Sequence, residues 1–239
     1  SLGVFMSMDF VSVLLYNVCI MQISWKGQAC FQLVISSRKD AQLKMVIDPY
    51  GESTGLSLPS LEADVVLVTH DHEDHNNRKG VKGEPFVISN PGEYEMKGVF
   101  VQGIASFHDE AQGKERGMNT IYVIDGEGIR VCHLGDFGQK ELTSEQLENI
   151  GDVDILLIPV GGVYTINGKE AQKVISQLEP KIVIPMHYLL PKLKYKLNPV
   201  EDFLRTMGAK KAEPLEKLVI KEKDLLAERE ETEIVVLQP

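Results

Sequence analysis

The residues 70–75, HDHEDH, place three histidines and three acids in six consecutive positions. His70 and His72 are two positions apart, so in extended backbone both imidazoles point to the same side and can bind one metal ion. Asp74 and His75 are adjacent, but a turning loop can direct both at a second ion. Imidazole with carboxylate is a ligand set that suits zinc, with iron or manganese as alternatives. A solvated polar turn is the competing interpretation.

One loop cannot complete such a site, so further ligands must come from other parts of the chain. The remaining histidines are His108 in ASFHDE, His133 in VCHLGDF and His187 in IPMHY. Each lies at or near the end of a predicted strand, and Gly135-Asp136 adds a carboxylate at a glycine turn. Because α/β folds bind ligands at strand ends, we expect a shared site there.

The predicted strands are short apolar runs, rich in β-branched residues and bounded by turn signals. They cover residues 21–25, 30–36, 43–47, 64–68, 86–89, 99–105, 120–124, 129–133, 154–159 and 181–185. Three helices are expected at 143–150, 168–178 and 199–207, and Asn167 with Glu170 forms a capping-box pattern before the second. ADVVLVTH and PKIVIPMHY each carry a histidine at the C-terminal end of an apolar strand, which suggests two sheets meeting edge to edge.

No low-complexity linker interrupts residues 21–239, which predicts a single domain. Residues 1–20 are apolar-rich but lack the basic region of a signal peptide, and their uninterrupted apolar part is too short to span a bilayer. We therefore expect residues 1–20 to be an N-terminal extension, either a packing arm or a non-native addition.

The charge balance limits the class of partner. The formal net charge is -10 and the isoelectric point is near 5.1, which argues against general affinity for nucleic acid or an anionic membrane. Cys19, Cys30 and Cys132 are widely spaced and form no CxxC pair, so neither a disulfide framework nor a thiolate zinc site is indicated. We expect reduced thiols in a cytoplasmic protein with a small-molecule substrate; an oligomer is compatible with the sequence.

HDHEDH fits the HxHxDH motif of the metallo-β-lactamase superfamily, and SFH, LGD and PMHY fit its further metal motifs in the expected order. The chain resembles the branch of small metal-dependent hydrolases that includes L-ascorbate-6-phosphate lactonase. The resemblance extends over about residues 21–200 and includes ISWKGQACFQL, IDPY and IPVGG. It implies an α/β fold, an αββα four-layer sandwich with mixed sheets and a dinuclear site. Relatives often have Gly-His where this chain has Gly27-Gln28, so no role of that histidine carries over.

The resemblance implies that seven side chains bind two divalent transition-metal ions, with zinc as the first expectation and manganese or iron as alternatives. They are His70, His72 and His108 for the first ion, Asp74, His75 and His187 for the second, and Asp136 as a bridge between both. Asp74 is also the expected catalytic residue, because a ligand carboxylate beside the nucleophile can orient it or accept its proton.

Four polar residues near these ligands receive other roles. His133 is expected to be an ordinary strand histidine close to the site. Asp48, at the end of KMVIDPY, is expected to orient the metal loop by hydrogen bonds, with a plain Asp-Pro turn as the alternative. Asp71 and Glu73 occupy the free positions of the motif and are expected to be solvated.

Several side chains outside the ligand set are candidates for substrate contact, and each has a purely structural alternative. They are Glu93, Tyr94, Lys114, Arg116, Asn119, Tyr164 and Tyr188.

The expected function is that of a metal-dependent hydrolase, which uses a metal-bound hydroxide on a small anionic ester, lactone or phosphoester. Two divalent ions and two ligand carboxylates leave a positive surplus, which lowers the pKa of bound water from about 15.7 toward 7 and favours anionic substrates. The alternatives are an RNA-processing metallonuclease, which the acidic balance disfavours, a di-iron redox enzyme, and a non-catalytic metal-binding or regulatory protein.

Overall fold

The computed structural model describes residues 20–36, 42–209, 213–226 and 231–239. A six-stranded sheet has the order β14 (Leu218–Ile220), β1 (Ile20–Trp25), β2 (Phe31–Ser36), β3 (Gln42–Ile47), β5 (Val65–Leu67) and β7 (Phe86–Ile88). A seven-stranded sheet has the order β15 (Glu233–Ile234), β13 (Ile182–Met186), β12 (Ile155–Pro159), β11 (Ile129–His133), β10 (Met118–Gly126), β9 (Val99–Phe107) and β8 (Gly92–Met96). Both sheets mix parallel and antiparallel pairs, as the resemblance implied.

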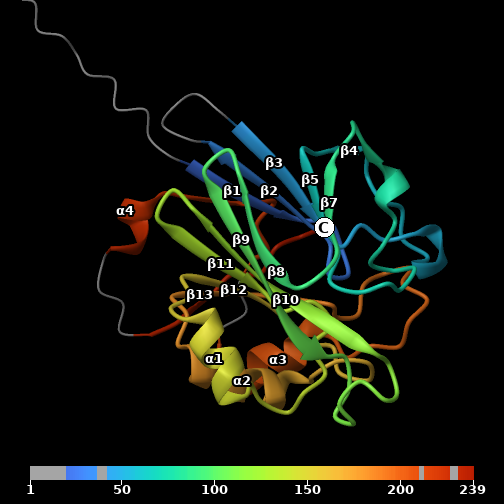
Figure 1. Cartoon of the computed structure of the whole chain (residues 1–239). Helices are drawn as coiled ribbons and strands as arrows, with labels where there is room; N and C mark the ends of the chain where they lie inside the picture. Colours follow the sequence, from blue (N-terminus) through green and yellow to red (C-terminus); the bar gives the residue numbers. More distant parts are fainter. Residues whose placement is uncertain (1–19, 37–41, 210–212, 227–230) are drawn as a thin grey trace, which may run out of the picture.

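The two large sheets pack face to face, so the expectation that they meet edge to edge is wrong (Figure 1). The inward side chains of both sheets form one apolar core. The Tyr122 hydroxyl on β10 donates to the carbonyl of Val68 beyond β5 at 3.0 Å, and the rings of Phe31 on β2 and His133 on β11 lie 5.7 Å apart. Apolar strands bury more surface across a shared face than along an edge, which explains the arrangement.

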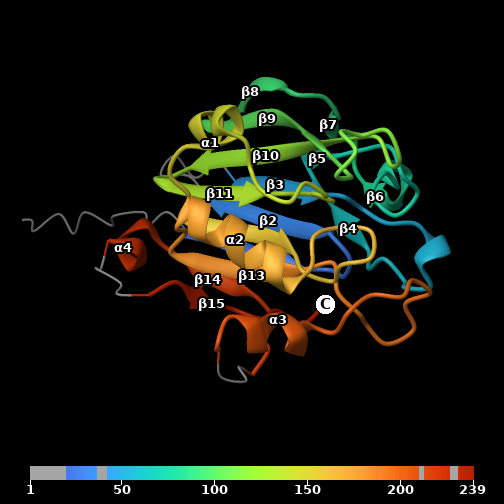
Figure 2. The ribbon, with the colours of Figure 1, turned by 90° about the horizontal axis from the view of Figure 1, so that it is seen from below.

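Helices α1 (Ser144–Ile150), α2 (Gly168–Leu178) and α3 (Val200–Thr206) cover the outer face of the seven-stranded sheet (Figure 2). The capping box predicted for α2 is present, because the Asn167 side chain accepts from the backbone of Glu170 while the Glu170 carboxylate accepts from the backbone of Asn167. Ala171, Val174 and Leu178 point into the core at helical spacing.

A second apolar cluster covers the outer face of the six-stranded sheet and includes Cys30, Val46, Val66 and Val68. The short helices η1 (Glu52–Thr54) and η2 (Arg78–Gly80) and the two-stranded sheet of β4 (Leu61–Glu62) and β6 (Val81–Lys82) belong to this region. β5 and the second half of β3, Met45 to Ile47, are therefore buried on both faces, which explains why these segments are continuous apolar runs.

The parallel strands direct their carboxyl ends to one end of the sandwich. β3 pairs in parallel with β5, and β11, β12 and β13 are parallel neighbours. Asp48 follows β3, His70 follows β5, Asp136 follows β11 and His187 follows β13. His108 joins them at the end of β9. The fold thus gathers at one place the polar residues that the sequence distributes over 140 positions.

All ten expected strands and the three expected helices are present, with boundaries that differ by at most two residues. The strands β4, β6, β14 and β15 and the short helix α4 (Glu222–Leu225) were not expected. Residues 1–19 of the expected extension lie outside the described residues, so that interpretation stays a prediction. No helix in the described ranges combines the length and apolar character that a membrane span requires.

Candidate metal centre

Three groups of side chains at this end of the sandwich have potential ligand atoms within 4.8 Å of one another. Together they contain all seven residues expected from the sequence. The groups are His70 with His72 and His108, His70 with His75 and Asp136, and Asp74 with His75 and His187.

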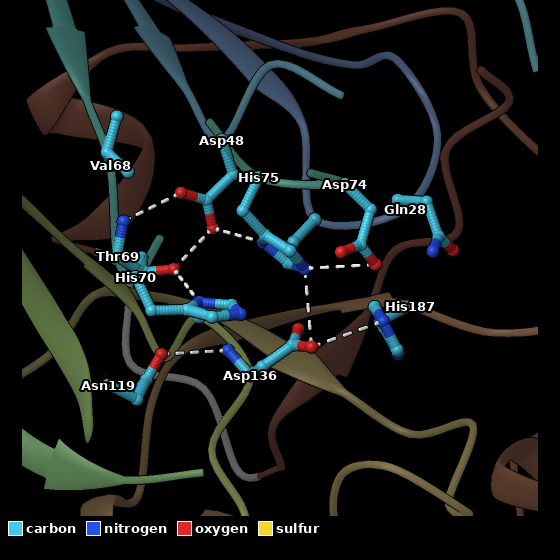
Figure 3. A network of polar contacts seen from close by, with 12 residues as sticks. Gln28, Asp48, Val68, Thr69, His70, Asp74, His75, Asn119, Asp136 and His187 are labelled. Atoms are coloured by element: carbon cyan, nitrogen blue, oxygen red, sulfur yellow. Dashed lines mark hydrogen bonds and ion pairs between the residues drawn. The ribbon is translucent and has the colours of Figure 1, made fainter. Parts of the chain in front are cut away.

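Asp136 lies at the centre of this cluster (Figure 3). Its Oδ2 is 3.2 Å from Nε2 of His75, 3.3 Å from Nε2 of His108 and 3.4 Å from Nε2 of His187. The carboxylate of Asp74 approaches the same His75 nitrogen at 3.5 Å. Asp136 therefore faces histidines of both expected metal sites.

The turn before Asp136 needs a glycine. Gly135 has a positive φ of 58°, and a Cβ there would lie 2.4 Å from Oδ1 of Asn119 and 2.8 Å from Cβ of Thr69. The same Asn119 oxygen accepts a hydrogen bond of 3.0 Å from the backbone N–H of Asp136. This contact fixes the backbone that carries the central carboxylate.

The polar atoms of the cluster are unpartnered in a way that fits bound metal ions. Nε2 of His70, Nε2 of His75 and Oδ1 of Asp136 are buried and have no hydrogen-bond partner. Each such atom costs about 1–3 kcal/mol when it is left unpaired. Nitrogen and carboxylate oxygen are the donor atoms that divalent transition metals accept, so coordination explains why this cost is tolerated here.

Asp48 holds the metal loop, as expected, and is not a plain turn residue. Its Oδ1 accepts from the backbone N–H of Thr69 at 2.8 Å, and its Oδ2 accepts from the Thr69 hydroxyl at 2.7 Å. Nδ1 of His75 lies 2.9 Å from the same Oδ2. Because a carboxylate only accepts, Nδ1 of His75 carries the proton of this bond and Nε2 faces the centre.

Thr69 fixes the second histidine in the same way. Its hydroxyl donates to Asp48, so the contact of 3.0 Å with Nδ1 of His70 is a hydrogen bond that the imidazole donates. Nε2 of His70 then remains as the free nitrogen. Thr69 immediately precedes the HDHEDH motif and could have been suspected from its position, whereas the contact of Asn119 with Asp136 has no local sequence signal.

The charges of the cluster prepare it for a cation. Burial lowers the pKa of His70 and of His108, so both imidazoles are neutral at neutral pH. Burial acts against a charge on His75 as well, but the carboxylates of Asp136 and Asp48 outweigh it and raise the His75 pKa well above its usual value. Burial also opposes ionisation of Asp136, yet His187 and His75 hold its pKa well below the usual range.

His133 is a strand histidine and belongs to none of the three ligand groups, as expected. The backbone N–H of Gly135 donates to its Nδ1 at 3.0 Å, so Nε2 carries the proton and donates to the carbonyl of Ala29 at 2.9 Å. This side chain ties the sheets together beside the centre. Asp71 and Glu73 are exposed, as expected.

Gln28 stands where the resemblance implied a histidine. Its carbonyl accepts from the backbone N–H of His187 at 3.0 Å and from the indole N–H of Trp25 at 2.8 Å, so the turn positions His187. The Gln28 side chain lies near Asp74 and His187 (Figure 3), fully buried, and neither its amide nitrogen nor its oxygen has a hydrogen-bond partner.

A cavity of about 250 Å³ opens beside the cluster. It is lined by His72, Asp74, His108, Arg116, Asp136, Tyr164, His187 and Tyr195. Of the candidate substrate contacts, Arg116 and Tyr164 thus reach the site. Tyr195 was missed, because YKLN carries no motif.

The other candidates do not line this cavity. Tyr188 is buried against Trp25, with ring centroids 4.8 Å apart, and Lys114 is exposed on its loop. Glu93 and Tyr94 line a different cavity, which Phe100 and Arg130 also border. The structural alternative for Glu93 and Tyr94, a turn followed by a strand, is confirmed, since both lie on β8.

The sequence pattern of a family described as "Beta-lactamase superfamily domain" matches residues 22–187, a span that contains all seven clustered ligands. The chain belongs to this superfamily. A UPF0173 metal-dependent hydrolase of Thermococcus onnurineus is 32% identical in an alignment 199 positions long, which covers 71% of this chain and 85% of the relative. A UPF0173 metal-dependent hydrolase of Methanoculleus marisnigri is 31% identical and covers 78% of this chain and 88% of its own.

A solved structure of a Thermotoga maritima protein shares this architecture. That protein is described as a Zn-dependent hydrolase of the metallo-β-lactamase superfamily. The two chains are 40% identical and superpose with a TM-score of 0.71, and the match covers 91% of this chain and 98% of the other. The metallo-β-lactamase fold, an α/β fold with mixed sheets that the resemblance implied, is confirmed by this similarity.

Proposed function

We propose that this chain is a metal-dependent hydrolase that binds two divalent transition-metal ions, zinc foremost, and hydrolyses a small anionic ester, lactone or phosphoester. Its similarity to proteins named as metal-dependent hydrolases supports the general activity. The observation that carries the proposal is the convergence of imidazole nitrogens and carboxylate oxygens at one end of the sandwich, beside a cavity. That arrangement suits metal-assisted attack of water on an acyl or phosphoryl group.

The proposed ligands divide into two sets that share a carboxylate. His70, His72 and His108 would hold one ion, Asp74, His75 and His187 the other, and Asp136 both. Two bound divalent ions supply a water of lowered pKa and polarise the carbonyl or phosphoryl oxygen of a substrate. The neutral imidazoles of His70 and His108 can coordinate without losing a proton.

Asp74 is the proposed catalytic residue. Asp74 and Asp136 both line the cavity, but Asp74 is partly exposed whereas Asp136 is only 2% exposed. Burial opposes its ionisation, but the nearby His75 outweighs that effect and lowers the Asp74 pKa, so the side chain is a carboxylate at neutral pH. A carboxylate at this position can orient the attacking water and accept its proton.

The cavity supports a small substrate rather than a polymer. Its volume of about 250 Å³ lies below the range of about 300–1,000 Å³ typical of sites for drug-sized ligands. Four positive charges on two ions against two ligand carboxylates leave a surplus that attracts an anion. The net charge of -10 disfavours an RNA substrate.

The location that fits this proposal is the cytoplasm, where thiols stay reduced. Cys30 and Cys132 are both free and buried. Burial raises the pKa of Cys132 to about 12, so this thiol is protonated and unreactive at neutral pH.

The test is metal reconstitution followed by a substrate screen. Metal-free protein would be loaded with zinc, manganese or iron(II), its metal content measured by elemental analysis, and its activity assayed on aryl esters, lactones and phosphodiesters. We expect two equivalents of metal and turnover in at least one class. Two bound metals without turnover in any class would favour a non-catalytic metal-binding protein, and fewer than two equivalents would contradict the dinuclear site.

A further inference from the structure

A second cavity of about 440 Å³ adjoins the metal cavity. It is lined by His108, Asp109, Glu110, Ala111, Glu115, Arg116, Gly138, Val163, Tyr164, Thr165 and Glu170. His108, Arg116 and Tyr164 line both cavities. Arg116 and Tyr164 therefore lie where a substrate would pass between the two cavities.

The backbone of Arg116 is fixed by one carboxylate. Asp109, which is 3% exposed, accepts hydrogen bonds from the backbone N–H groups of Gly113 at 2.9 Å, Glu115 at 3.0 Å and Arg116 at 2.7 Å. These bonds close the loop between β9 and β10 on itself. The loop therefore presents Arg116 from a defined position, although it lies at the surface.

The guanidinium of Arg116 remains available to a ligand. It lies over the ring of Tyr164, 5.8 Å from the centroid, a contact that orients its plane and leaves its N–H groups free to donate. Its ion pair with Glu115 is 3.8 Å long between side chains that are 36% and 67% exposed. An exposed pair of this kind contributes little and is readily exchanged for a better partner.

Two tyrosines line the metal cavity next to Arg116. The rings of Tyr164 and Tyr195 are 6.0 Å apart at an interplanar angle of 68°, an edge-to-face arrangement. Burial and the Asp74 carboxylate raise the pKa of Tyr195, so its hydroxyl is protonated at neutral pH. This side of the cavity thus presents one cation, Arg116, and the aromatic surface of the two tyrosines.

We propose that Arg116 is the specificity-determining residue of the cavity and binds a carboxylate or phosphate group of the substrate beside the rings of Tyr164 and Tyr195. This inference rests on the proposed hydrolase function and deepens it. A guanidinium fork matches the paired oxygens of both anions.

The acidic side chains of the second cavity restrict where the substrate anion can lie. Beyond Arg116 the lining carries Glu110, Glu115 and Glu170, and Lys140 pairs with the first of these at 2.7 Å. A substrate anion is therefore favoured beside the metal centre and disfavoured in the second cavity, where the carboxylates would repel it. The substrate class is a small ester or phosphoester with one anionic group close to the scissile bond and an uncharged or cationic remote part.

The binding test uses the zinc-loaded full chain and three probes that are not hydrolysed. The probes are 4-hydroxybenzoate, phenylphosphonate and the neutral analogue 4-hydroxybenzamide, titrated by calorimetry into the parent, Arg116→Gln and Arg205→Gln. Arg205 is a matched control, since its side chain is 77% exposed on α3 and does not line either cavity. We expect Arg116→Gln to lower the affinity for the two anions by about tenfold and to leave the affinity for 4-hydroxybenzamide unchanged.

Three outcomes of this titration decide the inference. Loss of affinity for both anions, or for one of the two, in Arg116→Gln alone supports it, and the affected probe identifies the anion. Equal affinity in the parent and Arg116→Gln would mean that the anions bind the metal ions directly, which overturns it. An equal loss in Arg205→Gln would indicate general charge attraction and overturns it as well.

A kinetic test separates this inference from the proposed function. The two substrates are 4-acetoxybenzoate and 4-acetoxybenzamide, which differ in one charge. We expect the parent to prefer the anionic ester, and Arg116→Gln to lose about tenfold of that preference, mainly through KM. Arg116→Lys keeps the charge without the planar fork, so its preference for the anionic ester should lie between those of the parent and Arg116→Gln.

The two failures are distinguishable. If both esters are hydrolysed with the same preference in the parent and Arg116→Gln, the role of Arg116 is wrong and the hydrolase stands. If neither ester is hydrolysed but the calorimetric preference for anions depends on Arg116, the anion site stands and the hydrolase proposal loses its support from these esters.

Discussion

Oδ2 of Asp48 lies 2.9 Å from Nδ1 of His75, and both side chains are completely buried. Asp48 follows β3, whereas His75 lies in the loop after β5, so the contact joins the ends of two parallel neighbours. It leaves Nε2 of His75 facing Asp136. The orientation of a proposed metal ligand thus depends on a carboxylate 27 positions earlier in the chain.

Asp48→Asn should weaken metal binding. The amide keeps the shape of the carboxylate but removes its charge and one acceptor oxygen, so His75 is no longer held in one orientation. Residues that support a ligand in this way typically contribute about 10–100-fold in metal affinity. Competition with a chromogenic chelator would measure the change.

Asp64→Asn is the matched control for this prediction. Asp64 also accepts a backbone hydrogen bond, from Lys44 at 2.8 Å, but it precedes β5 and is remote from the ligand cluster. Its variant should bind metal as the parent does. Equal affinities in Asp48→Asn and the parent would show that the contact with His75 has no influence on the centre.

Metal binding to His75 should release a proton at neutral pH. In the metal-free protein the carboxylates of Asp136 and Asp48 outweigh burial and hold the His75 pKa well above its usual value of about 6.5, so the imidazole is charged at pH 7. Coordination requires the neutral ring. Calorimetric zinc titrations in buffers of different ionisation enthalpy count the protons, and His75→Ala should release about one fewer.

The same shift predicts how the metal-free protein responds to pH. Because the folded-state pKa of His75 is raised, its contribution to stability is complete below the unfolded pKa of about 6.5 and is lost as pH rises through the folded pKa. As pH rises into the alkaline range, the melting temperature of the chelator-treated parent should therefore fall more than that of chelator-treated His75→Ala. Parallel pH profiles of the two proteins would refute the charged state of His75.

Asp136→Asn should separate the two proposed metal sites. The variant keeps the shape of a side chain that faces three histidines, but it removes the negative charge that offsets repulsion between two cations. We expect it to fold, to retain one ion more tightly than the other and to lose most turnover. Two tightly bound ions with normal turnover would show that Asp136 does not bridge.

His133→Gln should leave metal content unchanged and lower stability. The imidazole accepts from Gly135 and donates to the carbonyl of Ala29, and a buried group left unpaired costs about 1–3 kcal/mol. Urea unfolding of the metal-free proteins measures the loss. His108→Gln is the contrasting variant, because there metal content should fall; loss of a metal equivalent in His133→Gln would mean that the ligand set is wrong.

The ligand cluster could be predicted because its signals are local. An apolar strand followed at once by a polar ligand is visible in VVLVTH and in IVIPMH, and parallel neighbours bring such ends together. The supporting role of Asp48 was accessible for the same reason, since IDPY ends a strand next to β5.

Features that depend on distant parts of the chain could not be predicted. β14 pairs with β1 across almost the whole chain, and only Ile220 of its three residues is buried, so no periodic pattern marks it. The contacts of Asn119 with Asp136 and of Tyr164 with Tyr195 form only after the sheets and loops have packed. Face-to-face packing of the sheets likewise follows from total burial rather than from any single segment.

The proposed ligands are divided between the two sheets. His70, His72 and His75 follow β5 of one sheet, whereas Asp136 and His187 follow β11 and β13 of the other. Ions held by both sets would act as cross-links, so the halves of the sandwich could not separate until coordination had been broken. Removing metal should then accelerate unfolding and proteolytic cleavage, even where the equilibrium fold survives, and the lifetime of the folded molecule would depend on the supply of free metal around it.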